Sequence, residues 1–335
     1  MTDKPILRDT VVLGASAGGV EALKRLLSVF PPSLPASVFI VLHVAAEGDR
    51  SLASILDRST PLKVVFAEDG MATRYGCVYL APPDRHLTLS DGHVSVVFGP
   101  RENRCRPAID PLFRSAAVHR RARVIGVILT GLLDDGAQGL LAVKRCGGLA
   151  LIQTPDDAHA PAMPRHAAET LGASLDGSHG AEELGRRIVH AIGERTAPPP
   201  PVPPELAIEQ AMLTRTASPT QLEELGELVP MTCPECGGPL SAVGAREHKH
   251  YRCFTGHAFT ARTLLSSQHE RVERALWAAM RSLEERGNTL LVLAGESRKN
   301  SRTQAAASFE VEAVQLREHA GTIRRILLDQ HPAGD

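Results

Sequence analysis

Short runs of apolar, largely β-branched residues alternate with helix-length segments over the first half of this chain. The runs fall at 10–13, 38–42, 63–66, 77–80, 124–129 and 149–153. The segments between them carry apolar residues at helical spacing, such as Val20, Leu23, Leu27 and Phe30. Continuous apolar strands separated by helices are typical of a parallel sheet covered on both faces. The sequence therefore predicts an α/β domain with a doubly wound, mostly parallel sheet.

A second signal adds an antiparallel hairpin to this domain. Asp91-Gly92 separates the apolar runs 87–90 and 93–98, and this dipeptide favours a two-residue hairpin turn.

Proline marks the expected end of the α/β domain. Six of the 24 prolines fall between Pro198 and Pro204, which predicts an extended linker. A Cys/His segment and two helical patterns follow, with Gly287 or the polar run 296–303 separating the two patterns. We expect an α/β domain at 1–193, a proline-rich linker at 194–228, a small zinc-binding module at 229–262 and a helical tail at 263–335.

Composition excludes several classes of protein. The 37 Lys and Arg against 38 Asp and Glu leave a net charge of −1, whereas a nucleic-acid-binding domain usually carries a basic excess. Six cysteines in 335 residues are too sparse for a disulfide scaffold. The N-terminus has no apolar signal core, and no apolar run approaches the roughly 20 residues that span a bilayer. We therefore expect a cytoplasmic protein that neither binds nucleic acid nor inserts into a membrane.

A Gly-Ala-Ser-Ala-Gly-Gly turn, with Ser16 as its third residue, lies between the first apolar run and a helical segment. The G-x-S-x-G pattern in a strand–turn–helix context is typical of a nucleophile elbow. The amides of Ala17 and Gly18 would then open a helix N-terminus, where partial positive charge favours a developing oxyanion. Alternatively, Ser16 caps the helix at a phosphate-binding turn, although neither P-loop nor G-x-G-x-x-G spacing occurs here.

Two other predicted strand ends carry residues that suit a serine nucleophile. His43 follows the second run, and Asp134 and Asp135 follow the run at 124–129. Each also has an ordinary explanation, as a structural histidine or a helix cap. Because parallel strands bring their carboxyl ends to one edge of the sheet, the three turns are expected to converge. Ser16 would attack a carbonyl, His43 would accept its proton, and either aspartate would orient the imidazole, which predicts acyl transfer or ester hydrolysis.

Over residues 11–171 the chain resembles the catalytic domain of the chemotaxis protein-glutamate methylesterase (CheB) family. The resemblance rests on separated motifs in the same order, at 13–19, 41–44, 78–86, 106–113, 129–136 and 163–165. It implies hydrolysis of glutamyl methyl esters on the cytoplasmic helices of methylated chemoreceptors or similar signalling proteins, and also deamidation of receptor glutamines. It places the triad on Ser16, His43 and Asp135, the aspartate directly before Gly136. We expect no cofactor for catalysis.

The chain departs from the family pattern at three places. Ala17 stands where the family usually has threonine, and Gly131-Leu132-Leu133 replaces a glycine-methionine-glycine turn. Both changes could alter rate or substrate preference. Leu132 joins Ala17 and Gly18 as a candidate for the oxyanion-binding turns. The few residues before the first predicted strand leave no room for the receiver domain of the family's prototype, so we expect regulation by another route.

Beyond the linker, three cysteines and a histidine have the spacing C-x2-C-x16-C-x3-H. They are Cys233, Cys236, Cys253 and His257. Paired ligands of this kind suit a structural, tetrahedral zinc ion, while independent buried thiols are the alternative. His248 or His250 could replace His257 as the fourth ligand. The remaining cysteines, Cys77, Cys105 and Cys146, stand alone and are predicted to be ordinary core or surface thiols.

The sequence thus predicts a protein-glutamate methylesterase with a serine nucleophile. The alternative is a non-catalytic signalling scaffold that binds receptors or kinases through its C-terminal module. The helical tail is explained by a packed hairpin, and it would also suit an adaptor that binds a regulatory protein.

Overall fold

The computed structural model describes residues 6–43, 51–214, 224–244 and 249–329. These residues belong to two compact units, of which the first ends at Leu264 and the second begins at Leu265. In the described part of the chain, no helix is both long enough and apolar enough to cross a membrane.

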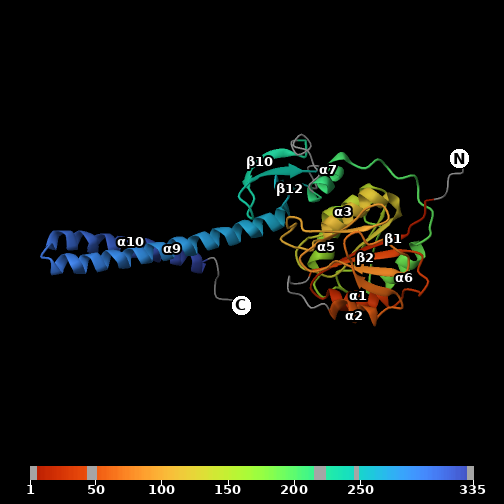
Figure 1. The fold of residues 1–335 in the computed structure, drawn as a ribbon, viewed down its shortest axis with the longest axis horizontal. Helices are drawn as coiled ribbons and strands as arrows, with labels where there is room; N and C mark the ends of the chain where they lie inside the picture. The colour runs from red at the N-terminus through yellow and green to blue at the C-terminus, as the bar shows by residue number, and fades with distance from the viewer. Residues whose placement is uncertain (1–5, 44–50, 215–223, 245–248, 330–335) are drawn as a thin grey trace. The chain divides into compact units, whose positions relative to one another are not determined.

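A seven-stranded parallel sheet forms the centre of the first unit (Figure 1). Its order is β3-β4-β2-β1-β7-β8-β9. The strands are β1 (Thr10–Ala15), β2 (Ser37–Leu42), β3 (Lys63–Phe66), β4 (Cys77–Leu80), β7 (Val124–Ile128), β8 (Leu149–Gln153) and β9 (Gly177–His179). Because β2 lies on one side of β1 and β7 on the other, the strand order reverses between β1 and β7. Ligands of open α/β sheets bind at such a switch point.

Alternate side chains of each strand face opposite layers of helices, as the period of a strand requires. Val11 and Leu13 pack among α1, α2 and α6, whereas Val12 packs among α3, α4 and α5. The helices are α1 (Gly19–Leu27), α2 (Ser51–Asp57), α3 (Ile109–Arg120), α4 (Ala137–Arg145), α5 (Ala162–Leu171) and α6 (Ala181–Ala191), with short 3-10 turns at Arg121–Arg123 and Gly172–Ser174. The predicted doubly wound α/β fold is confirmed.

The predicted hairpin is also confirmed, with β5 (His86–Leu89) and β6 (Val94–Val97) pairing antiparallel. Residues 198–203 have no regular secondary structure. The range predicted as linker nevertheless contains a helix, α7 (Pro204–Leu213). Proline is tolerated at the first position of a helix, where its missing N–H would have no helical acceptor, and Leu206, Ile208 and Met212 bury the helix.

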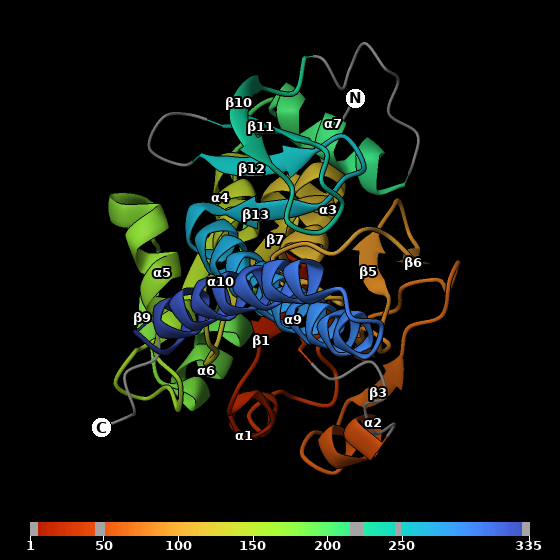
Figure 2. The ribbon, with the colours of Figure 1, turned by 90° about the vertical axis from the view of Figure 1, so that its left-hand side faces the viewer.

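The Cys/His segment forms a four-stranded antiparallel sheet that belongs to the same compact unit as the α/β domain. Its strands are β10 (Glu227–Thr232), β11 (Pro239–Val243), β12 (His250–Cys253) and β13 (Ala258–Thr260). Both views show this sheet beside α3 and α7 (Figures 1 and 2). We refer to residues 224–264 as the module.

The second unit is a helical hairpin made by α9 (Ala261–Lys299) and α10 (Thr303–Asp329), and the first four residues of α9 belong to the first unit. Met280 of α9 packs with Ala320 and Leu327 of α10. The helices turn in the predicted polar run, whereas Gly287 lies inside α9. Packing against α10 overrides the low helix propensity of this glycine, since an added Cβ would lie 3.6 Å from the Ala313 carbonyl.

Candidate active site

The turn that carries Ser16 connects β1 to α1 at the switch point. Gly18 has a φ of 76° and precedes the first residue of α1, and a Cβ there would lie 2.5 Å from Cβ of His159. Only glycine fits this position without strain. The Ser16 amide donates to the Thr130 carbonyl at 2.9 Å, which holds the turn against the loop that follows β7.

The three predicted turns meet at the carboxyl edge of the sheet. Ala15 and Leu42 are register partners in β1 and β2, and the His43 amide donates to the Ala15 carbonyl at 3.1 Å. Ser16 and His43 therefore follow directly adjacent strand ends. The loop after β7 contacts the other side of Ser16 through Thr130.

His43 and Asp135 form a hydrogen-bonded pair. His43 Nε2 lies 2.8 Å from Asp135 Oδ2, and the Asp135 side chain is only 2% exposed. The neighbouring acid has a different partner, because Asp134 Oδ1 accepts a hydrogen bond from the Thr263 hydroxyl at 2.8 Å. The structure thus brings Asp135, and not Asp134, to the imidazole.

The Ser16 hydroxyl makes no hydrogen bond to another described residue, His43 included. Catalytic hydrogen bonds are commonly long in unliganded enzymes and tighten around the substrate. Since Asp135 occupies Nε2, the nitrogen left to accept a proton is Nδ1 of His43. The amides of Ala17, Gly18 and Leu132 likewise have no partner among the described residues, so all three remain candidates for oxyanion donors.

The N-terminus of α3 surrounds the Asp135 carboxylate with donors. Asp135 accepts hydrogen bonds from the amides of Ile109 at 2.6 Å and Asp110 at 3.4 Å. The Asn103 side chain adds a third donor, with Nδ2 at 3.0 Å from Asp135 Oδ1. Backbone donors at a helix N-terminus favour an ionised carboxylate.

Ile109 also packs against the strand that leads to Ser16. A Cβ at Gly14 would lie 2.5 Å from Cγ2 of Ile109. Only a residue without a side chain allows α3 to approach β1 this closely. Ile109 therefore both donates to Asp135 and packs over the end of β1.

The pKa values of the pair follow from burial and from mutual attraction. Burial raises the pKa of Asp135, but the hydrogen bond and charge of His43 and the donors from Ile109 and Asn103 outweigh it and lower that pKa. Burial lowers the pKa of His43, but Asp135 and Cys105 outweigh it and raise that pKa to about 10. Asp110 behaves in the opposite way to Asp135, because burial and the nearby Asp135 charge raise its pKa well above the ordinary value. The pKa values of these two neighbouring carboxyl groups are thus shifted in opposite directions.

Sequence reasoning missed two residues that touch this pair. Cys105, predicted to be an ordinary thiol, places Sγ 3.7 Å from Nδ1 of His43. Asn103 bridges the carboxyl groups of Asp110 and Asp135. The available signal was their place just before the motif at 106–113, which opens α3.

The four predicted metal ligands come together in the module. Cys236 Sγ lies 3.6 Å from Cys253 Sγ, and His257 Nδ1 lies 3.5 Å from Cys253 Sγ and 3.8 Å from Cys233 Sγ. All four ligand atoms lie within 4.8 Å of one another. Tetrahedral zinc, with bonds of about 2.3 Å to sulfur and about 2.0 Å to nitrogen, separates its ligands by roughly 3.5–3.8 Å. These side chains therefore fit a zinc ion.

The alternative fourth ligands have other places. His250 Nε2 contacts Glu209, and His248 lies outside the described residues. Of the two described histidines, it is His257 that lies with the three thiols.

Comparison with known protein families matches residues 11–197 to CheB methylesterase. A crystal structure of the Thermotoga maritima CheB methylesterase catalytic domain superposes with a TM-score of 0.53 at 31% sequence identity. The match covers 55% of this chain and 99% of that domain.

Curated relatives are similar over the same region. A Leptospira interrogans protein, provisionally named protein-glutamate methylesterase/protein-glutamine glutaminase, is 41% identical over 162 residues, covering 48% of this chain and 84% of the relative. A Salmonella typhimurium protein with that name is 38% identical over 168 residues. In that case the match covers 49% of this chain and 48% of the relative. With its family match, its fold and this site, the chain belongs to the CheB methylesterase family.

Proposed function

We propose that this chain hydrolyses glutamyl methyl esters on the cytoplasmic helices of methylated chemoreceptors, or of similar methylated signalling proteins. The observation that carries the proposal is the buried His43–Asp135 pair at the sheet edge where Ser16 directly follows β1. The names of the relatives agree with this activity, and they give no support to a non-catalytic scaffold. Receptor helices of this kind would place the enzyme in the cytoplasm.

The reaction begins when Ser16 Oγ attacks the ester carbonyl while His43 Nδ1 accepts the hydroxyl proton. Asp135 stays ionised and stabilises the resulting imidazolium. Amides from Ala17, Gly18 or Leu132 stabilise the oxyanion of the tetrahedral intermediate. His43 then returns the proton to the methoxide oxygen, so the C–O bond breaks and methanol leaves an acyl-enzyme.

Water completes the cycle in the same geometry. His43 accepts a proton from water as its oxygen attacks the acyl carbon, and it returns that proton to Ser16 Oγ. A glutamate side chain is released and the free serine is restored. With a glutamine substrate, the group that leaves in the first half is ammonia, which accounts for the deamidation activity in the relatives' names.

The module would hold a structural zinc ion on Cys233, Cys236, Cys253 and His257. Four protein ligands leave no position for a substrate or a water molecule, so the ion would stabilise the module and take no part in the ester chemistry. The helical tail is a site for a regulatory protein in this proposal.

The test is methanol release from a chemoreceptor cytoplasmic fragment that carries isotopically labelled methyl esters. Wild type is expected to release the label, and Ser16→Ala to release it only at the background rate. Ser28→Ala, at an exposed serine on the same segment, is the matched control and should retain full activity. Equal release by wild type and Ser16→Ala would refute the proposed nucleophile.

A further inference from the structure

The Asn103 side chain connects the module to the catalytic acid. Its Oδ1 accepts a hydrogen bond from the Thr260 amide of β13 at 3.0 Å. Its Nδ2 donates to Asp135 at 3.0 Å and to Asp110 at 2.9 Å. The Asn103 amide also donates to the Ala258 carbonyl at 2.8 Å. Asn103 is therefore held by β13 on one side and holds Asp135 on the other.

A second contact reaches the loop of the catalytic acid from the same part of the module. Thr263, which is fully buried, donates from its hydroxyl to Asp134 at 2.8 Å. Thr263 also bonds to the Thr260 hydroxyl. Thr260, the last residue of β13, and Thr263, in the first turn of α9, thus each bind a neighbour of the His43–Asp135 pair.

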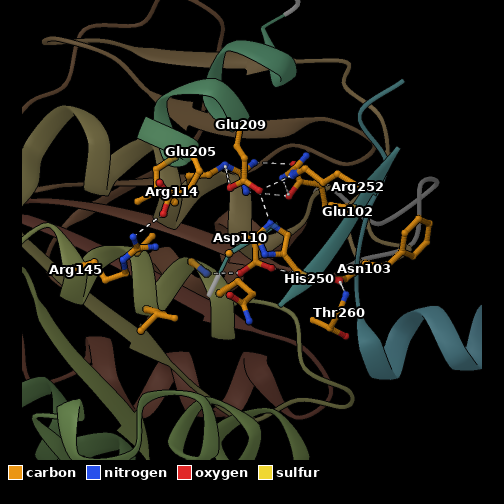
Figure 3. A pocket seen from close by; sticks show the side chains of 18 residues that line it. Glu102, Asn103, Asp110, Arg114, Arg145, Glu205, Glu209, His250, Arg252 and Thr260 are labelled. Carbon is orange, nitrogen blue, oxygen red and sulfur yellow. Dashed lines mark hydrogen bonds and ion pairs between the residues drawn. The ribbon is translucent and has the colours of Figure 1, made fainter. Parts of the chain in front are cut away.

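A buried ionic network anchors the module beside α3 and α7 (Figure 3). Arg252 of β12 lies 2.9 Å from Glu102 and 2.7 Å from Glu209 of α7. Glu102 also pairs with Arg114 of α3 at 2.7 Å. All four side chains are at most 4% exposed, and with Asn103 and Thr260 they line a cavity of about 160 Å³. Moving the module away would leave buried charges of this network without their partners, so the network holds the module in this position.

The backbone of Asn103 depends on these contacts. Its φ of 49° is in the left-handed region, which asparagine adopts more readily than most residues and which persists when the surrounding contacts hold it there. The contacts come from the metal-binding hairpin itself, since Cys253 ends β12 and His257 directly precedes Ala258 of β13. The apolar core of the module is small and includes two of the thiols, Cys233 and Cys253, so a metal ion bound to them would help to keep the hairpin in place.

We propose that Asn103 is a positioning residue for Asp135, that the module holds it there, and that zinc bound to the module therefore controls esterase activity. The part of this proposal that concerns activity rests on the function proposed above. When the hairpin loosens, Asn103 is free to leave its left-handed conformation. Asp135 then loses one hydrogen-bond donor, and the amide group that lies between the carboxyl groups of Asp135 and Asp110 is removed.

Substitutions test the positioning role through kcat. Asn103→Gly removes the side chain that connects Thr260 to Asp135, while glycine still permits the left-handed backbone. We expect kcat to fall at least tenfold, which is the effect of losing a hydrogen bond to a charged acceptor, and KM to stay unchanged. Thr263→Val should lower kcat about threefold to tenfold, and Thr263→Ser, which keeps the hydroxyl, should restore it. Arg262→Ala, which breaks only an exposed ion pair with Glu169, is the control and should match wild type. Wild-type kcat in Asn103→Gly would overturn the positioning role. If that variant fails to fold, wild-type kcat in Thr263→Val would overturn the hold of the module on the loop of the catalytic acid.

Metal removal tests the control by zinc without relying on activity. The zinc-loaded full-length protein and the same protein after chelation are compared by hydrogen exchange. Residues 102–110 and 131–136 should lose protection when the metal is removed and regain it on adding zinc, while β8 should be unaffected. Unchanged protection in 102–110 would overturn the proposal. If wild type released no methanol, the proposed function would fail, and the exchange result would still decide whether the module holds Asn103.

Discussion

Replacing Arg252 by methionine should destabilise the first unit strongly. Arg252 is 1% exposed and lies between the carboxylates of Glu102 and Glu209. Methionine preserves much of the volume of the side chain but none of its charge. Both carboxylates then stay buried with one cationic partner fewer.

The size of the effect follows from the partners that remain. Removing one member of a buried ion pair typically costs about 3–5 kcal/mol, because the other charge is left uncompensated. Glu102 keeps Arg114 at 2.7 Å, and Glu209 keeps His250. We therefore expect the lower end of that range, about 3 kcal/mol. For a unit of this size, that loss lowers Tm by roughly 6–12 °C.

Calorimetry of the full-length chain measures this shift, with Arg262→Met as the control. Arg262 pairs with Glu169 on the surface, where both side chains are more than half exposed, and such pairs contribute about 0–1 kcal/mol. The control should leave Tm within a few degrees of wild type. A Tm shift for Arg252→Met no larger than that of the control would refute the reasoning.

The pH dependence provides a second check on the same variant. Burial raises the pKa of Glu102, but Arg114 and Arg252 outweigh it and lower that pKa to about 2. A carboxyl group whose pKa falls on folding stabilises the native state above its unfolded pKa, and that contribution disappears as the pH falls through the folded pKa. The gap between wild type and Arg252→Met should therefore be largest near neutral pH and narrow as the pH drops toward about 2.

Three further predictions concern the active site and the metal. Asp135→Asn should lower kcat by about 10³–10⁴-fold, because the imidazole is then mis-oriented. Asp134→Asn should lower kcat far less. Equal losses of kcat in the methanol assay would contradict Asp135 as the partner of His43. The raised pKa of His43 implies a protonated imidazole at neutral pH, whereas only a neutral imidazole accepts a proton. We therefore expect kcat/KM to rise with pH toward about 10. A pH profile that is flat above pH 7 would contradict a raised pKa for His43. The purified chain should contain about one zinc ion per molecule by metal analysis. The Cys253→Ser variant should lose this zinc, and the control Cys77→Ser should keep it. A wild-type chain without metal would exclude the zinc site.

Local sequence patterns were sufficient to predict six of the seven strands of the parallel sheet, whereas the short edge strand β9 was missed. The apolar runs indicate the strands, and Asp91-Gly92 indicates the hairpin turn. Both signals are local, because the burial of a strand and the geometry of a turn depend on residues adjacent in the sequence. The adjacency of Ser16 and His43 followed from strand parallelism. The pairing of Asp135 rather than Asp134 came from family resemblance, since two adjacent acids look alike in sequence.

Contacts made across the fold could not be predicted in this way. Asn103, Glu209 and Arg252 have no local pattern that indicates burial, and each is fixed by a partner far along the chain. Charged residues at such positions read as solvated surface. The position of Cys105 beside His43 was likewise missed, because it depends on a contact between the segment before α3 and the residue that follows β2.

The double contact of Ile109 has a consequence for the precision of the catalytic groups. Its side chain packs against Gly14, two residues before the nucleophile, and its amide donates to the acid. A thermal displacement of α3 therefore carries β1 and Asp135 in the same direction. Thermal displacements of Ser16 and of the His43–Asp135 pair are therefore expected to be correlated. The distance between the nucleophile and the base should then fluctuate less than the position of either group relative to the rest of the protein.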